Sequence, residues 1–256
     1  MIWLRSALFS LSLLITTPIF CAIALLSFAC APLTRYRAIT LWSRITIFLA
    51  RTLCGVRFRV TGAQHLPSEP AIVLSKHQSA WETLAFQVIF PPQAWVVKKS
   101  LLRVPFLGWG MAMLNPISID RGSGAKALKR ILEQGRQRLE QGFWVVIFPE
   151  GTRVAPGTKG KYGIGGAWLA TRTHAKVVPV AHNAGEFWPR HGFLKRPGLI
   201  TVSIGESIDP TGMKPAELMA RVEQWVENET RRIGGQDAVE VGKDYEDGLQ
   251  RVAKQP

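Results

Sequence analysis

The sequence predicts an α/β protein whose mostly parallel central sheet is flanked by helices and preceded by an N-terminal membrane-embedded helical segment. Short β-rich runs alternate with helical patterns after residue 55, which is typical of strands joined by helical crossovers. The 29 positions from Ser6 to Thr34 contain no charged residue, which predicts the membrane segment. With 47% hydrophobic residues, the chain is not an intrinsically disordered protein.

We expect three parts. Residues 1–54 form a membrane anchor with a basic amphipathic helix, residues 55–234 form one α/β domain, and residues 235–256 form a polar tail.

The apolar N-terminal run LFSLSLLITTPIFCAIALLSF is longer than the ~20 residues that cross a bilayer. It also exceeds the ~7–15 apolar residues of a cleaved signal peptide. Pro32 directly follows the small-residue stretch 29–31, so a retained anchor is favoured over cleavage. Pro18 leaves two arrangements open, one spanning helix or two shorter helices that dip into one leaflet.

The basic residues around this run predict its orientation. Only Arg5 precedes it, while four arginines follow it: Arg35, Arg37, Arg44 and Arg51. The positive-inside rule therefore predicts the inner (cytoplasmic) membrane, with the rest of the chain facing the cytoplasm. Helical spacing of apolar residues in 38–53 predicts a helix that lies on anionic headgroups or packs on the domain core.

The net charge of +14 is unevenly distributed. Residues 1–68 contain seven Arg and no Asp or Glu, and residues 69–200 carry 18 basic and 7 acidic residues. This predicts an anionic partner, either nucleic acid or an anionic membrane. The apolar N-terminus opposes a nucleic-acid binder, and membrane lipids are the expected partner. The three cysteines lack metal-ligand spacing, so no metal site is expected.

Seven strands are predicted from β-branched and aromatic runs bounded by turn residues: 56–60, 71–75, 94–98, 116–120, 143–148, 176–181 and 199–205. Apolar residues at helical spacing predict four helices in this part of the chain: 80–90, 123–141, 164–173 and 214–232. In a parallel sheet, ligands bind beyond the carboxyl ends of the strands. The loops that follow these ends are therefore the candidate site.

The stretch KHQSAWET (76–83) follows the second predicted strand and has two interpretations. Ser79 and Glu82 fit a capping box for the next helix. With His77 in the loop and Glu82 in the first helical turn, the carboxylate can also orient the imidazole as a general base. The spacing alone allows both.

The stretch FPEGTR (148–153) follows another apolar strand. Glu150 and Arg153 would face the same crevice as His77. The alternative is an ordinary β-turn, in which Pro149 and Gly151 are the turn residues.

The stretch SIDRGSG (118–124) places Arg121 before small residues that open a helix. Backbone N–H groups at such a position favour an anion. The alternative is a surface loop. For VVPVAHNAG (177–185), a buried strand followed by a turn is the simpler interpretation.

Together these stretches resemble, in order and spacing, the conserved blocks of the glycerolipid acyltransferases, and they are most similar to the bacterial 1-acyl-glycerol-3-phosphate acyltransferases. The resemblance covers about residues 70–185 and implies that 55–234 is an acyltransferase domain with that family's fold. It rests on H-x4-E from His77 to Glu82, Lys98-Lys99-Ser100-Leu101 with Pro105, Ile119-Asp120-Arg121, residues 148–153, and Val178-Pro179-Val180 with Asn183.

The resemblance implies a reaction and a set of roles. His77 takes the proton of the acceptor hydroxyl, Glu82 orients His77, and the hydroxyl attacks the thioester of acyl-CoA or acyl carrier protein without an acyl-enzyme. The acceptor is lysophosphatidate, the product is phosphatidate, and no cofactor is required. The implied substrate-binding residues are Lys98, Lys99, Arg121, Glu150, Gly151, Thr152 and Arg153.

Within this set, Arg121 and Arg153 would hold the acceptor phosphate, and Glu150 and Gly151 would position the glycerol. Position 82 departs from the family's usual H-x4-D by one methylene.

Two alternatives remain from the sequence. Another lysolipid acceptor, such as a lyso-aminolipid, would leave Arg121 and Arg153 without a phosphate. A non-enzymatic lipid-binding protein of the same fold would be expected to lack the base or the phosphate-holding residues, and these are present: His77, Glu82, Glu150 and Arg153.

Overall fold

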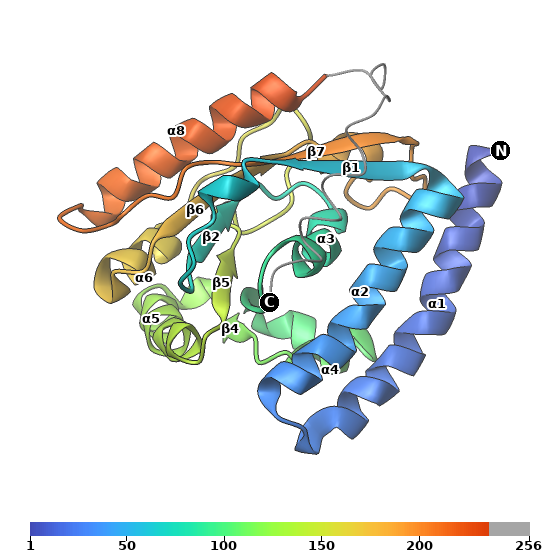
Figure 1. Cartoon of the computed structure of the whole chain (residues 1–256), viewed down its shortest axis with the longest axis horizontal. Helices are drawn as coiled ribbons and strands as arrows, with labels where there is room; N and C mark the ends of the chain where they lie inside the picture. Colours follow the sequence, from blue (N-terminus) through green and yellow to red (C-terminus); the bar gives the residue numbers. More distant parts are fainter. Residues whose placement is uncertain (236–256) are drawn as a thin grey trace.

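A single sheet forms the centre of the computed structural model, which describes residues 1–235 apart from the side chain of Arg121 (Figure 1). Its order is β1-β7-β6-β2-β5-β3-β4, and every pair is parallel except β6 and β7. The predicted mostly parallel sheet is confirmed. Each predicted strand is present within one residue at either end: β1 (Val56–Thr61), β2 (Ile72–Ser75), β3 (Gln93–Lys98), β4 (Ile117–Ile119), β5 (Trp144–Ile147), β6 (Val177–His182) and β7 (Gly198–Ile204).

The four helices predicted for the domain are also present: α3 (Trp81–Ile89), α5 (Ala125–Glu140), α6 (Gly165–Thr173) and α8 (Pro215–Ile233). Shorter elements were not predicted, because runs of three to six residues are too short to show a helical period. They are η2 (Ala63–His65), η3 (Lys99–Arg103), α4 (Leu107–Ala112), η4 (Arg121–Ser123) and α7 (Ala184–Phe187).

The sheet separates two hydrophobic clusters, because successive side chains of a strand point to opposite faces. On one face, Val73 and Val146 pack with residues of α2 and α3. On the other face, Ile72 and Val145 pack with residues of α5, α6 and α8. The α/β architecture therefore has helices on both faces of the sheet, as Figure 1 shows.

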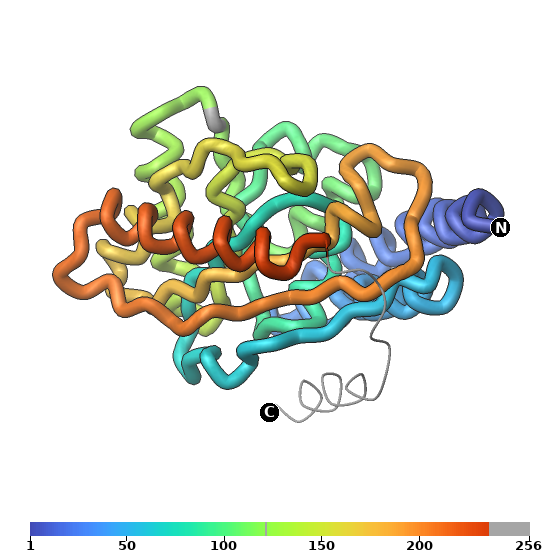
Figure 2. Tube along the Cα trace, turned by 90° about the horizontal axis from the view of Figure 1, so that it is seen from above, coloured from blue at the N-terminus to red at the C-terminus, as the bar shows by residue number. Residues whose placement is uncertain are grey.

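The N-terminal segment is a helical hairpin of α1 (Ile2–Leu26) and α2 (Pro32–Cys54), joined through η1 (Ser27–Ala29). The break considered at Pro18 is absent, because α1 continues through this residue and the chain reverses at the loop after α1 instead. In the described part of the chain, Ile2–Ala29 is the one stretch long and apolar enough to cross a membrane. The hairpin lies at one end of the molecule, and α8 lies toward the other (Figure 2).

The helix α1 is packed into the folded domain. Phe9 is completely buried and stands edge-on to Trp188, with ring centroids 5.1 Å apart. The hydroxyl of Ser6 accepts a hydrogen bond from the backbone N–H of Lys195. Removing α1 would therefore expose part of the core.

The helix α2 shows one of the two arrangements expected for residues 38–53, packing on the domain core. One face packs on the core, where Ser43 donates a hydrogen bond to Gln87 of α3 at 3.0 Å. The opposite face is an exposed stripe of alternating basic and apolar residues: Arg37, Leu41, Arg44, Phe48 and Arg51. The polar tail predicted at 235–256 lies outside the described residues from 236 onward.

Candidate active site

The strand order brings the candidate loops together at one edge of the sheet. β2 lies between β5 and β6, and β3 follows β5. Because these strands are parallel to β2, their carboxyl ends share an edge. The loops starting at Lys76, Phe148 and Asn183 are therefore neighbours, with Lys98 at the end of the next strand.

His77 and Glu82 are in direct contact. Nδ1 of His77 lies 2.8 Å from Oε1 of Glu82, and the same oxygen accepts the backbone N–H groups of Gln78 at 2.9 Å and Ser79 at 2.7 Å. Ser79 Oγ in turn accepts the N–H of Trp81 in the first turn of α3. Half of the predicted capping box therefore occurs together with the carboxylate–imidazole contact, because one oxygen of Glu82 serves both. The N-cap position itself is Ala80, and the Ser79 hydroxyl bonds to the N–H of Trp81 instead of that of Glu82.

The surroundings keep Glu82 ionised. Burial raises the pKa of this fully buried carboxyl, but His182, His77 and the N–H of Ser79 together outweigh burial and hold the pKa below its usual value. An ionised Glu82 accepts a hydrogen bond from Nδ1–H of His77, so the proton stays on Nδ1 and the lone pair is on Nε2. In this arrangement the imidazole can accept a proton at Nε2.

The neighbouring rings restrict the imidazole of His77. It stacks on Phe148 with ring centroids 4.0 Å apart, and its side chain is 14% exposed. His182, whose Nε2 lies 4.0 Å from Oε1 of Glu82, is completely buried, and burial lowers its pKa. Nε2 of His182 lies 2.9 Å from the carbonyl oxygen of Lys76. Sequence reasoning treated His182 as part of a buried strand and did not assign it to the site.

A mostly apolar cavity of about 490 Å³ opens beside His77. Lys98 and Arg153 also line it, so three of the predicted site residues share one space. The remaining wall comes from α1, α2, α3, β3, η3, α4 and the loops between them, and its apolar residues include Leu13, Phe20, Ile39, Trp42, Leu101, Leu107 and Met111. The imidazole of His77 and two cations therefore face a space suited to an apolar chain with an anionic head.

Other predicted residues lie outside the lining of this cavity. Lys99 and Thr152 are exposed on the loops that follow β3 and β5. Gly151 has a φ of +68° and donates its N–H to the carbonyl of Phe148, so it closes the turn. Arg121 begins η4, two residues after the end of the edge strand β4.

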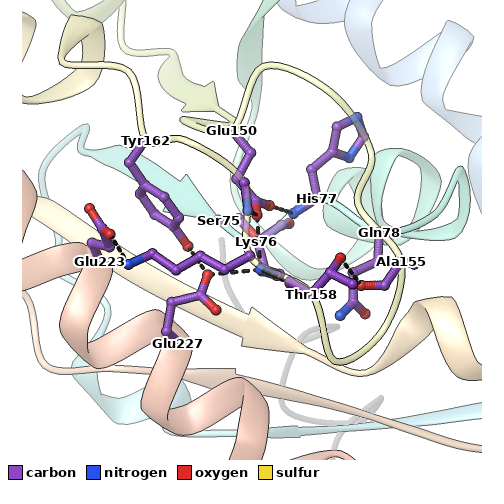
Figure 3. A network of polar contacts seen from close by, with 12 residues as sticks. Ser75, Lys76, His77, Gln78, Glu150, Ala155, Thr158, Tyr162, Glu223 and Glu227 are labelled. Atoms are coloured by element: carbon purple, nitrogen blue, oxygen red, sulfur yellow. Dashed lines mark hydrogen bonds and ion pairs between the residues drawn. The ribbon is translucent and has the colours of Figure 1, made fainter.

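Glu150 does not face the cavity. Its side chain is fully buried, and Oε1 contacts the ammonium of Lys76 and the N–H of Gly160 (Figure 3). Oε2 accepts the backbone N–H of His77 at 3.0 Å. This differs from the direct glycerol contact that the resemblance implies. Lys76 itself was not predicted, although it belongs to the same stretch as His77.

Comparisons with known proteins identify the family of this chain. An acyltransferase family model matches residues 57–183. A 1-acyl-sn-glycerol-3-phosphate acyltransferase of Pseudomonas aeruginosa is 45% identical over 209 residues, which cover 78% of this chain and 81% of the relative. A 1-acyl-sn-glycerol-3-phosphate acyltransferase of Saccharomyces cerevisiae is 29% identical over 213 residues, which cover 77% of this chain and 67% of that relative.

The fold is also similar to the crystal structure of a 1-acyl-sn-glycerophosphate acyltransferase from Thermotoga maritima. The TM-score is 0.75 at 21% identity, and the match covers 91% of this chain and 96% of that one. A non-enzymatic lipid-binding protein is therefore not the better interpretation. The chain belongs to the acyltransferase family, and it is an acyltransferase enzyme.

Proposed function

We propose that this protein transfers a fatty acyl group from acyl-CoA or acyl carrier protein to the free sn-2 hydroxyl of 1-acyl-glycerol-3-phosphate, which gives phosphatidate. The names of the relatives from Pseudomonas and Saccharomyces support this acceptor. The observation that carries the proposal is the His77–Glu82 pair, 2.8 Å apart, beside a cavity that Arg153 and Lys98 also line.

In the proposed mechanism, Nε2 of His77 takes the proton as the acceptor oxygen attacks the thioester carbonyl. The resulting imidazolium is stabilised by the carboxylate of Glu82 through Nδ1. Collapse of the tetrahedral intermediate breaks the carbon–sulfur bond, and the imidazolium returns its proton to the departing thiolate. The hydroxyl is acylated directly, so the mechanism needs no acyl-enzyme.

The cations beside the base give the acceptor phosphate its partners. Arg153 and Lys98 line the cavity, and a guanidinium can bind two phosphate oxygens at once. Arg121 is proposed as a further phosphate ligand from the family resemblance. Its backbone follows Ile119, which pairs with Lys98 across β3 and β4. The apolar wall would hold an acyl chain.

We also propose that the enzyme works on the cytoplasmic face of the inner membrane, with the hairpin inserted into one leaflet. Both halves of α1 contact the rest of the protein, through Phe9 on Trp188 and through Cys21 in the cavity wall. A helix held along its length by the α/β domain fits an interfacial position better than a perpendicular span. The arginines of the α2 stripe would then contact anionic headgroups.

The experiment measures thiol release from acyl-CoA by the detergent-purified full chain, with and without 1-acyl-glycerol-3-phosphate. We expect release that depends on the acceptor and is abolished in His77→Ala, whose melting temperature stays close to that of the unchanged protein. His65→Ala is the matched control, because His65 bonds to the carbonyl of Ile204 on β7. Retained turnover in His77→Ala would remove His77 from the mechanism.

Acceptor and donor are then varied separately. Release only with other lysolipids would support the alternative acceptor, a lysolipid such as a lyso-aminolipid. Release only with acyl carrier protein thioesters would assign the donor.

A further inference from the structure

Lys76, directly before His77, is a buried cation with three protein partners. Its side chain is 0% exposed, and Nζ lies 2.8 Å from Oε1 of Glu150, 2.7 Å from Oε1 of Glu227 and 2.9 Å from the carbonyl of Thr158 (Figure 3). A buried ammonium is costly unless it is paired and hydrogen-bonded. The position of Lys76 is therefore tied to these partners.

The first partner links Lys76 to the backbone of the proposed base. While Oε1 of Glu150 binds Lys76, Oε2 accepts the N–H of His77 at 3.0 Å. The carbonyl of His77 accepts the N–H of Val154 at 2.8 Å, and the carbonyl of Lys76 lies 2.9 Å from Nε2 of His182. The backbone of Lys76 and His77 is thus fixed by hydrogen bonds to Glu150, Val154 and His182. In Figure 3 the imidazole of His77 points out of this network.

The second partner links Lys76 to α8, far along the chain. Oε1 of Glu227 also accepts the hydroxyl of Tyr162 at 2.8 Å. Burial, together with the bond to Glu227, raises the pKa of Tyr162, so the phenol keeps the proton that it donates. Neither Glu227 nor Tyr162 lines the cavity beside His77. Glu227 contacts Lys76 directly, and Lys76 connects it through Glu150 to the backbone N–H of His77.

We propose that Lys76 is a positioning residue that holds the loop of His77 through Glu150, and that Glu227 and Tyr162 act on the same loop through Lys76. The proposal rests on the proposed function, in which His77 is the base. Small displacements matter here, because a shift of about 1 Å in a catalytic group can lower a rate by roughly 100-fold.

The kinetic test uses Lys76→Met, Glu227→Gln and Tyr162→Phe in the full-length protein. We expect kcat to fall about 100-fold in Lys76→Met and about 10-fold in the other two, while KM for acceptor and donor stays within about twofold. Glu223→Gln is the matched control, because Glu223 lies one turn earlier on α8 and pairs with Lys159 at the surface. Its kcat should not change.

A second readout does not depend on turnover. Hydrogen exchange of the His77 amide should be at least about 10-fold faster in Lys76→Met and Glu227→Gln than in Glu223→Gln, while the amides of β7 keep their rates. Unchanged kcat and unchanged His77 exchange in folded Glu227→Gln would overturn the proposal, even if Lys76→Met does not fold. If the wild-type protein is inactive, the proposed function is overturned instead. The exchange rates would still test whether Lys76 and Glu227 hold the loop of His77.

Discussion

Replacing Glu82 with Gln removes the charge beside His77 while keeping an oxygen in nearly the same place. In the protein, Oε1 of Glu82 accepts from Nδ1 of His77 and from the N–H groups of Gln78 and Ser79. A Gln oxygen can still accept all three hydrogens. The variant should therefore fold, and the change in activity should report the charge.

The expected magnitude follows from the 2.8 Å between Nδ1 and Oε1. In an effective dielectric constant of about 20, two unit charges at this distance interact by roughly 6 kcal/mol. A tenfold change in rate corresponds to about 1.4 kcal/mol. Because the imidazolium forms only as His77 takes the proton, most of this energy belongs to the transition state. We expect kcat to fall by about 10³- to 10⁴-fold with a smaller change in KM.

The assay is acceptor-dependent thiol release at saturating acyl-CoA. Glu229→Gln is the matched control, because the carboxylate of Glu229 binds Ser203 and Arg232 instead of His77. A folded Glu82→Gln enzyme with kcat within about threefold of the unchanged protein would refute the role of the charge.

The stability of the same variant should depend on pH. The pKa of Glu82 lies below its ordinary value of 4.5 in the folded protein, so the unfolded state binds the proton more tightly. The stabilisation by Glu82 is then complete above about pH 4.5 and is lost as the pH falls through the folded value. The difference in melting temperature between the unchanged protein and Glu82→Gln should therefore shrink in acid. A difference that grows as the pH falls would contradict an ionised Glu82.

Three further predictions concern the acceptor, the hairpin and the cavity. Arg153→Ala should raise the acceptor KM by about 10- to 100-fold and leave the donor KM unchanged. This factor corresponds to the binding free energy lost with one charge-assisted hydrogen bond. Equal effects on both substrates would count against phosphate binding there. Phe9→Ala should lower the free energy of unfolding by about 3–5 kcal/mol in denaturant titrations, because the ring is completely buried against Trp188. A loss below about 1 kcal/mol would contradict the packing of α1. Met111→Trp should lower kcat/KM for long-chain acyl donors about 10-fold and spare short-chain donors, because the indole would fill part of the cavity. Equal losses for both chain lengths would show that this cavity does not hold the acyl chain.

Local patterns predicted most of the architecture. The strands and the four main helices of the domain follow from residue periodicity, which is a property of neighbouring residues alone. The contact between His77 and Glu82 was also predicted, because a loop residue and a residue of the first helical turn are close in the chain. Parallel strands further predicted that the loops after β2 and β5 would meet.

Other features depended on contacts between distant parts of the chain. A proline inside a helix weakens it. Yet α1 continues through Pro18, because it packs against α2 and the domain. The short helix α4 lacks a clear periodicity and lies against α1. Neither result follows from the local sequence.

The role of Glu150 illustrates the same limit within the site. The sequence by itself determined that a carboxylate follows β5 beside His77, since motif spacing and strand direction are encoded locally. Only the tertiary structure decided that this carboxylate turns inward to Lys76, and that Glu227 of α8 is the second carboxylate bound to Lys76. The physical reason is that a buried ammonium selects its partners by proximity in space, and here one of them lies 151 positions away in the chain.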